Sequence, residues 1–334
     1  MGSTTESPTQ LPIIDLTPFL SPTSTPQSRL QCAKSLVHAC HTTGFIYITN
    51  HGIPPALLSE AFSWSKRFFA LSEDEKSQAS HPPGSNVFRG YSKVGHEMIP
   101  EMEGEKVRGV VDFNESYGMG HDGNKGQPNV WLPDSILPGY RVFVDKFYSK
   151  CWKTSTSVLR ALALGLELES EDYLLQFHSE IENELTFRHY PPVDAGRVKS
   201  GEMDRLGAHT DFDSFTLLWQ DENAGLEVKV RDLEGKGEWR SVDFVEGALV
   251  MNIGDVLSRW SNGTSFLLTP PPKALSFVPF RPVVASKFKH EERLSHINTP
   301  PCPPPNLRPQ LRHQRRYPND ETSVLHSVFR GPEE

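Results

Sequence analysis

The chain has 334 residues, of which 37% are hydrophobic and 23% are charged, and its formal net charge is -8. This composition predicts a globular core and argues against a nucleic-acid partner. The apolar runs are much shorter than the roughly 18 residues that cross a bilayer. The N-terminus has no signal-peptide features, and the four scattered cysteines exclude a disulfide framework. We therefore expect a cytoplasmic protein without a membrane partner.

The N-terminal half is predicted to contain helices with two short strands among them. The strands are residues 11–16 (LPIIDL) and 45–49 (FIYIT), which are rich in β-branched and aromatic residues. Three stretches repeat apolar residues at helical spacing, and these are residues 26–43, the segment after Pro55, and residues 138–165.

From Glu184 onward the pattern changes to short strands. The clearest strands are residues 187–190, 215–219, 226–230 and 248–253. A chain with helices first and short strands later is typical of the α+β class, with the strands forming a sandwich or a barrel.

The strongest local motif is His209-Thr210-Asp211. Two residues that are two positions apart on a strand share one face, so His209 and Asp211 can hold one cation together. Their side chains should then lie within about 4 Å of each other, because each ligand atom lies about 2.1 Å from the metal. A facial triad of two histidines and one carboxylate is the usual site of non-haem Fe(II). Most isolated His-x-Asp triplets, however, are ordinary surface residues.

The sequence around this motif reads RLGAHTDFDSFTLLWQD and is followed by AGLEV, GEWRSV and GALVMNIGDVLSRWSNG. Upstream stand LPIIDL, GFIYITNHGIP and KRFFALSEDEK. Together these segments resemble the Fe(II)/2-oxoglutarate-dependent dioxygenases, in the branch that includes isopenicillin N synthase, over residues 11–263. The resemblance implies an α+β fold whose core is a double-stranded β-helix, or jelly roll, with N-terminal and flanking helices.

The same resemblance implies a function. We expect Fe(II), 2-oxoglutarate and O2 as cofactors, with ascorbate in support, and oxidation of a small-molecule substrate in secondary metabolism. Hydroxylation, desaturation and cyclisation of the substrate all remain open. We also expect a monomer.

The resemblance assigns roles to particular residues. His209 and Asp211 match two iron ligands, and Tyr190 matches a tyrosine that holds 2-oxoglutarate, although a tyrosine before proline in a strand is often structural. Arg293 and Ser295 match an Arg-x-Ser signature that binds the distal carboxylate of 2-oxoglutarate, a role that suits the planar fork of arginine. Chance could also produce so short a pattern.

A turn at residues 252–255 matches the family's support of the metal-bearing strands. Gly254 is expected to adopt a backbone conformation there that other residues resist.

The resemblance fails after Gly263. The family's third iron ligand is a histidine expected near Pro270, and the next histidines are His290 and His296, either of which could enter from a displaced strand. We expect no third histidine at the metal, and weak or absent turnover. Two alternatives therefore stay open. The protein could be a dioxygenase-like pseudoenzyme, or an iron oxidase that does not use 2-oxoglutarate.

The composition changes at the same point. Thirteen of the 28 prolines lie between Pro270 and Pro332, and residues 264–334 hold ten basic and six acidic residues. Such a stretch is typical of a poorly ordered tail, and an unspliced intron or a shifted reading frame would produce the same change. The sequence predicts three parts, which are an N-terminal segment at 1–125, the dioxygenase core at 126–296 and a proline-rich basic tail at 297–334.

Two further motifs carry no function in this interpretation. Gly118 to Gly123 matches the G-x-G-x-x-G pattern, but a dinucleotide site needs a helix directly after it, and a flexible loop is expected here. His51 is expected to pack or cap rather than bind metal, because no second ligand lies near it in sequence.

Overall fold

A computed structural model describes most of the chain. The described residues are 11–83, 88–95, 112–193, 196–197, 205–223, 225–231, 237–261, 284–288 and 322–329.

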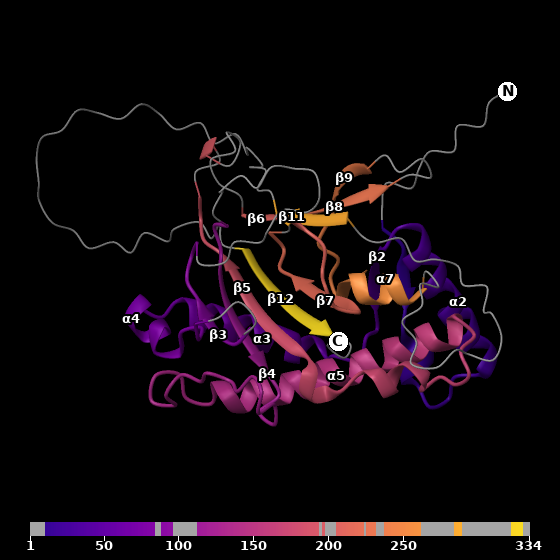
Figure 1. Cartoon of the computed structure of the whole chain (residues 1–334), viewed down its shortest axis with the longest axis horizontal. Helices are drawn as coiled ribbons and strands as arrows, with labels where there is room; N and C mark the ends of the chain where they lie inside the picture. Colours follow the sequence, from indigo (N-terminus) through magenta and orange to yellow (C-terminus); the bar gives the residue numbers. More distant parts are fainter. Residues whose placement is uncertain are drawn as a thin grey trace, which may run out of the picture.

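Two β-sheets form the centre of the molecule (Figure 1). The larger one runs in the order β1 (Ile13–Asp15), β2 (Phe45–Thr49), β10 (Ala248–Ile253), β7 (Phe215–Gln220), β12 (Thr322–Phe329), β5 (Glu184–Tyr190), β4 (Glu115–Gly120) and β3 (Gly90–Ser92). The smaller one runs in the order β6 (Leu206–His209), β11 (Val284–Phe288), β8 (Leu226–Arg231) and β9 (Gly237–Ser241). Neighbouring strands are antiparallel except for the parallel pair β1–β2.

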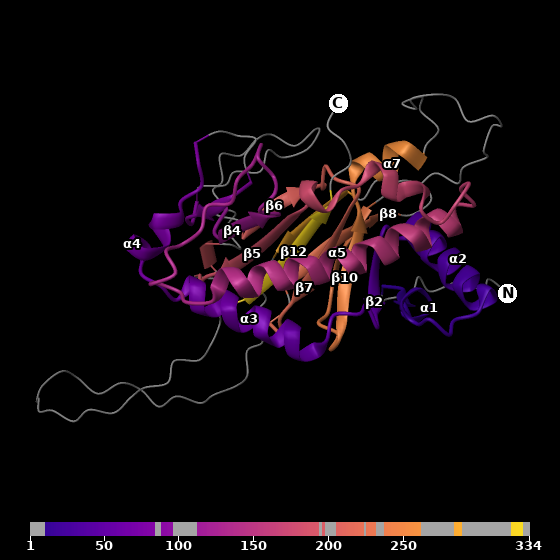
Figure 2. The ribbon, with the colours of Figure 1, turned by 90° about the horizontal axis from the view of Figure 1, so that it is seen from below.

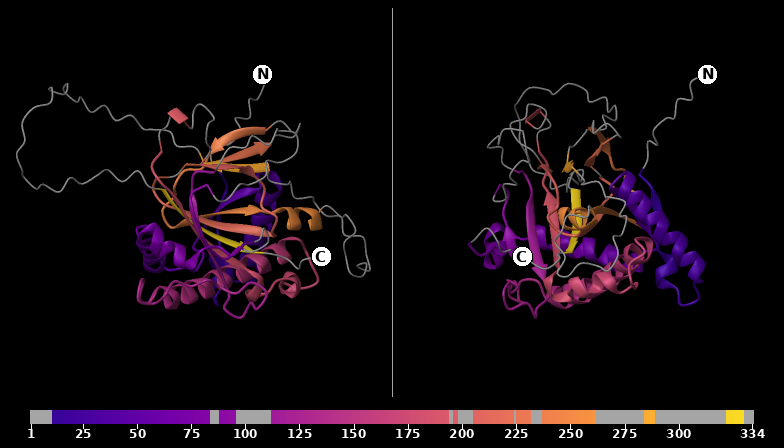
Figure 3. Two further views of the ribbon diagram at one scale, coloured as in Figure 1. Left: turned by 60° about the vertical axis from the view of Figure 1, so that its left-hand side comes forward. Right: turned by 45° about the vertical axis from the view of Figure 1, so that its right-hand side comes forward.

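The two sheets face each other, as both views of Figure 3 show, and share an apolar layer. Leu218 and Val250 from the large sheet pack in this layer with Leu206 and Val228 from the small one. The arrangement is the predicted jelly roll, closed by two facing antiparallel sheets.

Helices cover the outer face of the large sheet, and Figure 2 shows α3 and α5 lying across it. The helices are α1 (Thr17–Leu20), α2 (Pro26–Thr42), α3 (Pro55–Phe69), α4 (Glu73–Lys76), α5 (Tyr140–Gly165) and α7 (Asp255–Ser261), with 3-10 turns η1 (Ser77–Ala79), η2 (Tyr173–Phe177) and η3 (Glu180–Glu182). The three helices predicted from apolar spacing are confirmed. No helix in the described ranges is long and apolar enough to cross a membrane.

The ends of α2 follow from local chemistry. The side chain of Thr25 accepts a hydrogen bond from the backbone N–H of Ser28 at 3.1 Å, which caps the first turn. After the last turn, Gly44 has a φ of +75°, a left-handed conformation that glycine adopts without strain.

Successive side chains of β5 point to opposite faces of the large sheet. Leu185 and Phe187 belong to the core under the helices. Tyr190 belongs to the layer between the sheets. This alternation gives the strand an apolar outer face and a more polar inner face.

β12 differs from the expectation that residues 297–334 lack regular structure. It lies between β5 and β7, in the middle of the large sheet, and pairs with both (Figure 1). The physical reason is local, since residues 322–329 contain no proline and are rich in β-branched residues. The expectation was too broad because it applied the high proline content of residues 297–334 to this proline-free stretch as well. The remainder of that segment, 297–321 and 330–334, lies outside the described residues.

The G-x-G-x-x-G pattern is not a dinucleotide site. Gly118 and Gly120 lie in β4, so the loop expected for this stretch is wrong for its first half, and the residues that follow form a turn and a loop rather than a helix.

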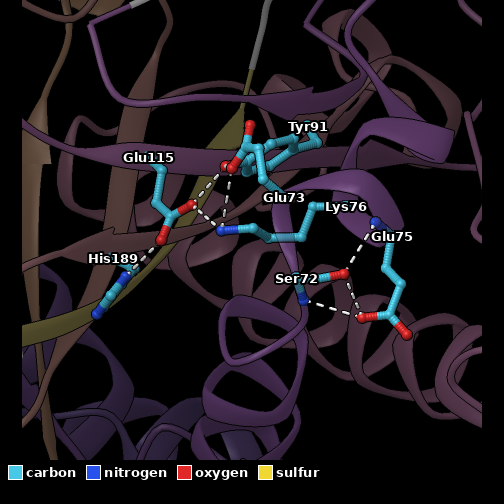
Figure 4. A network of polar contacts seen from close by, with 7 residues as sticks. All are labelled: Ser72, Glu73, Glu75, Lys76, Tyr91, Glu115 and His189. Carbon is cyan, nitrogen blue, oxygen red and sulfur yellow. Dashed lines mark hydrogen bonds and ion pairs between the residues drawn. The ribbon is translucent and has the colours of Figure 1, made fainter.

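A buried polar network joins β3, β4, β5 and α4 (Figure 4). Glu115 accepts hydrogen bonds from Lys76 Nζ at 2.7 Å, from the Tyr91 hydroxyl at 2.6 Å and from His189 Nδ1 at 2.7 Å. Burial raises the pKa of the Glu115 carboxyl, but these three donors outweigh it and hold that pKa below its usual range. The Lys76 and Glu115 side chains are only 8% and 6% exposed, so their charges depend on each other.

We predict that Glu115→Gln destabilises the protein by about 3–5 kcal/mol, because it removes the buried anion that pairs with Lys76 and leaves only the more exposed Glu73 carboxylate, at 3.6 Å. Urea denaturation followed by circular dichroism measures the free energy of unfolding. Glu169→Gln, at an exposed position, is the control and should change it by less than about 0.5 kcal/mol. Equal stability of the two variants would contradict the assignment.

Candidate functional site

His209 and Asp211 lie together at the end of β6. His209 is the last residue of the strand, and Asp211 follows two positions later. His209 Nε2 is 3.5 Å from Asp211 Oδ1, and the two side chains are 15% and 23% exposed. The distance expected from their spacing is confirmed, and the two atoms can approach one ion from adjacent sides.

Hydrogen bonds to Oδ2, the carboxylate oxygen that does not face His209, fix the orientation of the Asp211 side chain. Oδ2 accepts hydrogen bonds from Thr216 Oγ1 at 2.6 Å and from Asn252 Nδ2 at 2.7 Å. Burial raises the pKa of this carboxyl, but His209 and these two donors lower it well below its usual range. Asp211 therefore stays ionised, with Oδ1 directed at His209.

A hydrogen bond from Nδ1, the ring nitrogen that does not face Asp211, fixes the orientation of the His209 ring. Nδ1 lies 2.9 Å from the carbonyl oxygen of Gly207 and donates to it, because a carbonyl can only accept. In the neutral ring, Nε2 is then the nitrogen that carries the lone pair, the form in which histidine binds metals. Burial lowers the pKa of His209, and the Asp211 carboxylate raises it above its usual value. An imidazole nitrogen and a carboxylate oxygen form a donor pair that fits Fe(II).

The start of α7 supports the loop that carries Asp211. The backbone N–H groups of Gly254 and Asp255 donate to the carbonyls of Ser214 and Asp211 at 3.0 and 2.8 Å. Thr210 Oγ1 donates to Asp255 Oδ2 at 3.0 Å. The predicted supporting turn at 252–255 therefore contacts the candidate ligand directly.

The predicted reason for Gly254 needs correction. Its φ is not in the left-handed region. A Cβ at this position would instead lie 2.2 Å from the carbonyl oxygen of Asp213, so the close approach of two backbones requires glycine.

Two residues that the sequence analysis missed hold β6 from the other side. Asp112 Oδ1 accepts from the Gly207 N–H at 2.8 Å, and Asn114 Nδ2 donates to the Arg205 carbonyl at 2.8 Å. They precede His209 by about a hundred residues, and no local pattern marks them.

Tyr190 lies on the inner face of β5 and is 1% exposed. The guanidinium carbon of Arg205 is 5.4 Å from its ring centroid, and Arg205 Nη2 donates to the Tyr190 carbonyl at 2.8 Å. The ring is thus packed firmly between the sheets. The other predicted cofactor residues, Arg293 and Ser295, lie outside the described residues.

In the part of the chain that the structure describes, no group of three or more His, Cys, Asp or Glu residues could hold a metal ion. His51 is not near enough to contribute. It is 3% exposed, its Nδ1 accepts from the Ile53 N–H, and burial lowers its pKa to about 4. His290 and His296 lie outside the described residues, as does Pro270.

Comparisons with known proteins agree with this geometry. Residues 11–135 match the family model of the N-terminal region of the non-haem dioxygenase in morphine synthesis, and residues 181–275 match the 2OG-Fe(II) oxygenase superfamily. The chain is 35% identical to a proline hydroxylase of Petromyces alliaceus over 250 residues, which cover 75% of this chain and 76% of that protein. It is 38% identical to a 2-oxoglutarate-dependent dioxygenase of Glarea lozoyensis, over 71% and 72% of the two chains.

The chain belongs to the Fe(II)/2-oxoglutarate-dependent dioxygenases. Its fold agrees with that of a full-length Neurospora crassa protein crystallised with alpha-KG, at a TM-score of 0.71 and 26% identity, over 98% of this chain and 87% of the other. The dioxygenase uses Fe(II), 2-oxoglutarate and O2 and oxidises a small metabolite.

We predict that Gly254→Ala destabilises this dioxygenase by about 1–3 kcal/mol, because the added methyl group forces the Asp213 backbone away from α7. Denaturation in urea measures the change. The matched control is Gly126→Ala, where the nearest atom to a new Cβ is Asn124 Oδ1 at 3.4 Å. If both variants unfold at the same urea concentration, the close approach is not what requires glycine.

Proposed function

We propose that His209 and Asp211 hold the catalytic iron through Nε2 and Oδ1. The observation that carries this proposal is the pairing of these two atoms at 3.5 Å, with the opposite atom of each side chain already engaged in hydrogen bonds. Both ligands are thereby presented in one orientation before any metal binds, which is the usual role of the groups behind a metal ligand.

When bound, iron and 2-oxoglutarate would supply the oxidising chemistry, in which one oxygen atom of O2 enters succinate as 2-oxoglutarate loses CO2 and the other oxidises the substrate. The chain's own residues position these groups. Asp211 contributes a fixed anionic oxygen, and His209 contributes a neutral nitrogen. The apolar layer that includes Leu206, Leu218 and Val250 keeps water away from the inner side.

The substrate is proposed to be a small, partly apolar metabolite, oxidised by hydroxylation. The support is the likeness to the Petromyces alliaceus protein named a proline hydroxylase, which makes free L-proline the first compound of a candidate panel. We further propose a cytoplasmic monomer with no nucleic-acid or membrane partner, in keeping with the net charge of -8.

Tyr190, Arg293 and Ser295 remain proposed contacts of 2-oxoglutarate. The position of Tyr190 between the two sheets supports its proposed contact with 2-oxoglutarate. The roles of Arg293 and Ser295 rest on the resemblance alone.

We expect Fe(II)-dependent succinate formation from 2-oxoglutarate that His209→Ala abolishes. Because the sequence predicts no third histidine at the metal, the iron should be held weakly, so turnover should need Fe(II) in excess and disappear after dialysis. Succinate measured by chromatography, with ascorbate and the substrate panel present, gives the rate. His38→Ala, an exposed histidine on α2, is the control and should turn over normally. Undiminished turnover by His209→Ala would exclude this iron site.

The metal affinity of further histidine variants tests for a third ligand. The sequence predicts that none of the later histidines binds the metal. The register of β12 adds His326 to these candidates, because it pairs with Leu218 and Thr186 of the neighbouring strands. His290→Ala, His296→Ala and His326→Ala should each retain metal affinity, and a loss in any one of them identifies the missing ligand.

We predict that Asn252→Ala weakens metal binding by about 10- to 100-fold, because Asp211 Oδ2 loses one of its two donors and the carboxylate can turn. Mn(II) affinity, measured by calorimetry without O2, reports the change independently of turnover. Asn223→Ala, at an exposed position in the turn after β7, serves as control. An Asn252→Ala variant with wild-type affinity would show that the hydrogen bond does not orient the ligand.

A further inference from the structure

A buried histidine that the proposed iron site does not use lies behind the 211–214 loop. His178 directly follows η2 and is only 8% exposed. Its Nδ1 lies 2.7 Å from the carbonyl oxygen of Leu174, and its Nε2 lies 2.9 Å from Ser214 Oγ. The ring therefore bridges the segment after α5 and the loop that begins at Asp211.

The two contacts decide the tautomer of the His178 ring. A carbonyl oxygen can only accept, so Nδ1 carries the proton and donates to Leu174. Nε2 then has the lone pair and accepts from the Ser214 hydroxyl. Burial lowers the pKa of His178, and the bond to Leu174 offsets only part of this effect, which keeps the ring neutral near pH 7. Because both nitrogens are engaged, His178 supports the loop and is not itself an iron ligand.

Ser214 is the residue through which His178 acts on the loop. It is fully buried, and it stands between Asp211 and Thr216, the donor to Asp211 Oδ2. Its carbonyl accepts from the Gly254 N–H at 3.0 Å, so its backbone is held at the start of α7 and its side chain is held by His178. A shift of Ser214 would move both the Asp211 loop and the first residues of β7, where Thr216 lies.

Aromatic packing keeps His178 in place against α7. The indole of Trp260, on α7, meets the imidazole at an interplanar angle of 78°, with ring centroids 6.1 Å apart. The same indole lies 5.6 Å from the Phe177 ring. α7 also donates backbone hydrogen bonds to the carbonyls of Asp211 and Asp213, at 2.8 and 3.1 Å. The loop is therefore held by the backbone of α7 and by a ring that packs on α7.

We propose that His178 is a positioning residue, which holds Ser214 and thereby sets the orientation of the Asp211 carboxylate toward the metal. The inference rests on the proposed iron site at His209 and Asp211. A buried hydroxyl left without its acceptor is costly, so the loop would rearrange to provide another one. Groups directly behind a metal ligand change metal affinity by about 10- to 100-fold when they are removed. His178 acts through one further residue, so we expect an effect at the lower end of this range.

The test separates the two hydrogen bonds of the ring by two amide substitutions. The side-chain oxygen of glutamine reaches the position of Nε2, so His178→Gln can still accept from Ser214. The side-chain nitrogen of asparagine reaches only the position of Nδ1, so His178→Asn keeps the bond to Leu174 and loses Ser214. Calorimetry with Mn(II) on the full chain, without O2, measures the metal affinity. His178→Asn should weaken it by about 10-fold, and His178→Gln should stay within about 2-fold of the wild type.

Ser214→Ala removes the same hydrogen bond from its other end. It should weaken Mn(II) binding as much as His178→Asn does. The double variant should bind no more weakly than either single one, because both substitutions break one interaction. If His178→Asn does not fold, Ser214→Ala alone carries the comparison with the wild type.

The control replaces another buried histidine. His51, in the loop after β2, is 3% exposed and has no part in the iron site. His51→Asn should destabilise the fold and keep the wild-type Mn(II) affinity. Urea denaturation of every variant verifies that each one is folded under the conditions of the calorimetry.

Three results would overturn the role of His178. They are wild-type affinity in both His178→Asn and Ser214→Ala, an equal loss in His178→Gln and His178→Asn, and additive losses in the double variant. His209→Ala separates these results from failure of the iron site. If His209→Ala binds Mn(II) as tightly as the wild type, the iron site is wrong and the role of His178 falls with it. If His209→Ala loses Mn(II) while His178→Asn and Ser214→Ala keep it, only the role of His178 is wrong.

Discussion

Asp211 can present one oxygen to a metal only because its other oxygen is bound twice. Thr216 comes from β7 and Asn252 from β10, so the carboxylate is fixed by two adjacent strands of the large sheet, while its backbone follows a strand of the small one. The orientation of the site thus depends on the two sheets keeping their relative position. The apolar layer between them and the backbone bonds of α7 to the 211–214 loop maintain that position.

The two faces of β5 have different roles, since one packs against the helices and the other faces the small sheet. On β5, Phe187 and His189 face the helices, whereas Arg188 and Tyr190 face the small sheet. The buried bond between His189 and Glu115 ties β5 to β4 on the helix side. A substitution in that network would therefore disturb the strand that positions Tyr190 as well as the fold, although the network lies on the opposite face of that strand.

The sequence was sufficient to predict the features that depend on local period. The helices at 26–43 and 138–165, the strand at 248–253 and the pairing of His209 with Asp211 all follow from spacing and composition. Contacts between distant segments were beyond such reasoning. Asp112 and Asn114 precede β4 and contact the start of β6 across about ninety residues of sequence, which no short pattern encodes.

The central place of β12 has a consequence for how the protein folds. β12 fills the gap between β5 and β7, both of which precede it by about 100 residues or more. Pairing over such a distance is slow, because loop closure must occur before the contacts are gained. Until then the edges of β5 and β7 stay open in the middle of the sheet, and open edges invite pairing between chains. The nascent chain should therefore depend on chaperones, and aggregation rather than inactivity should be the main fate of a product that stops before residue 322.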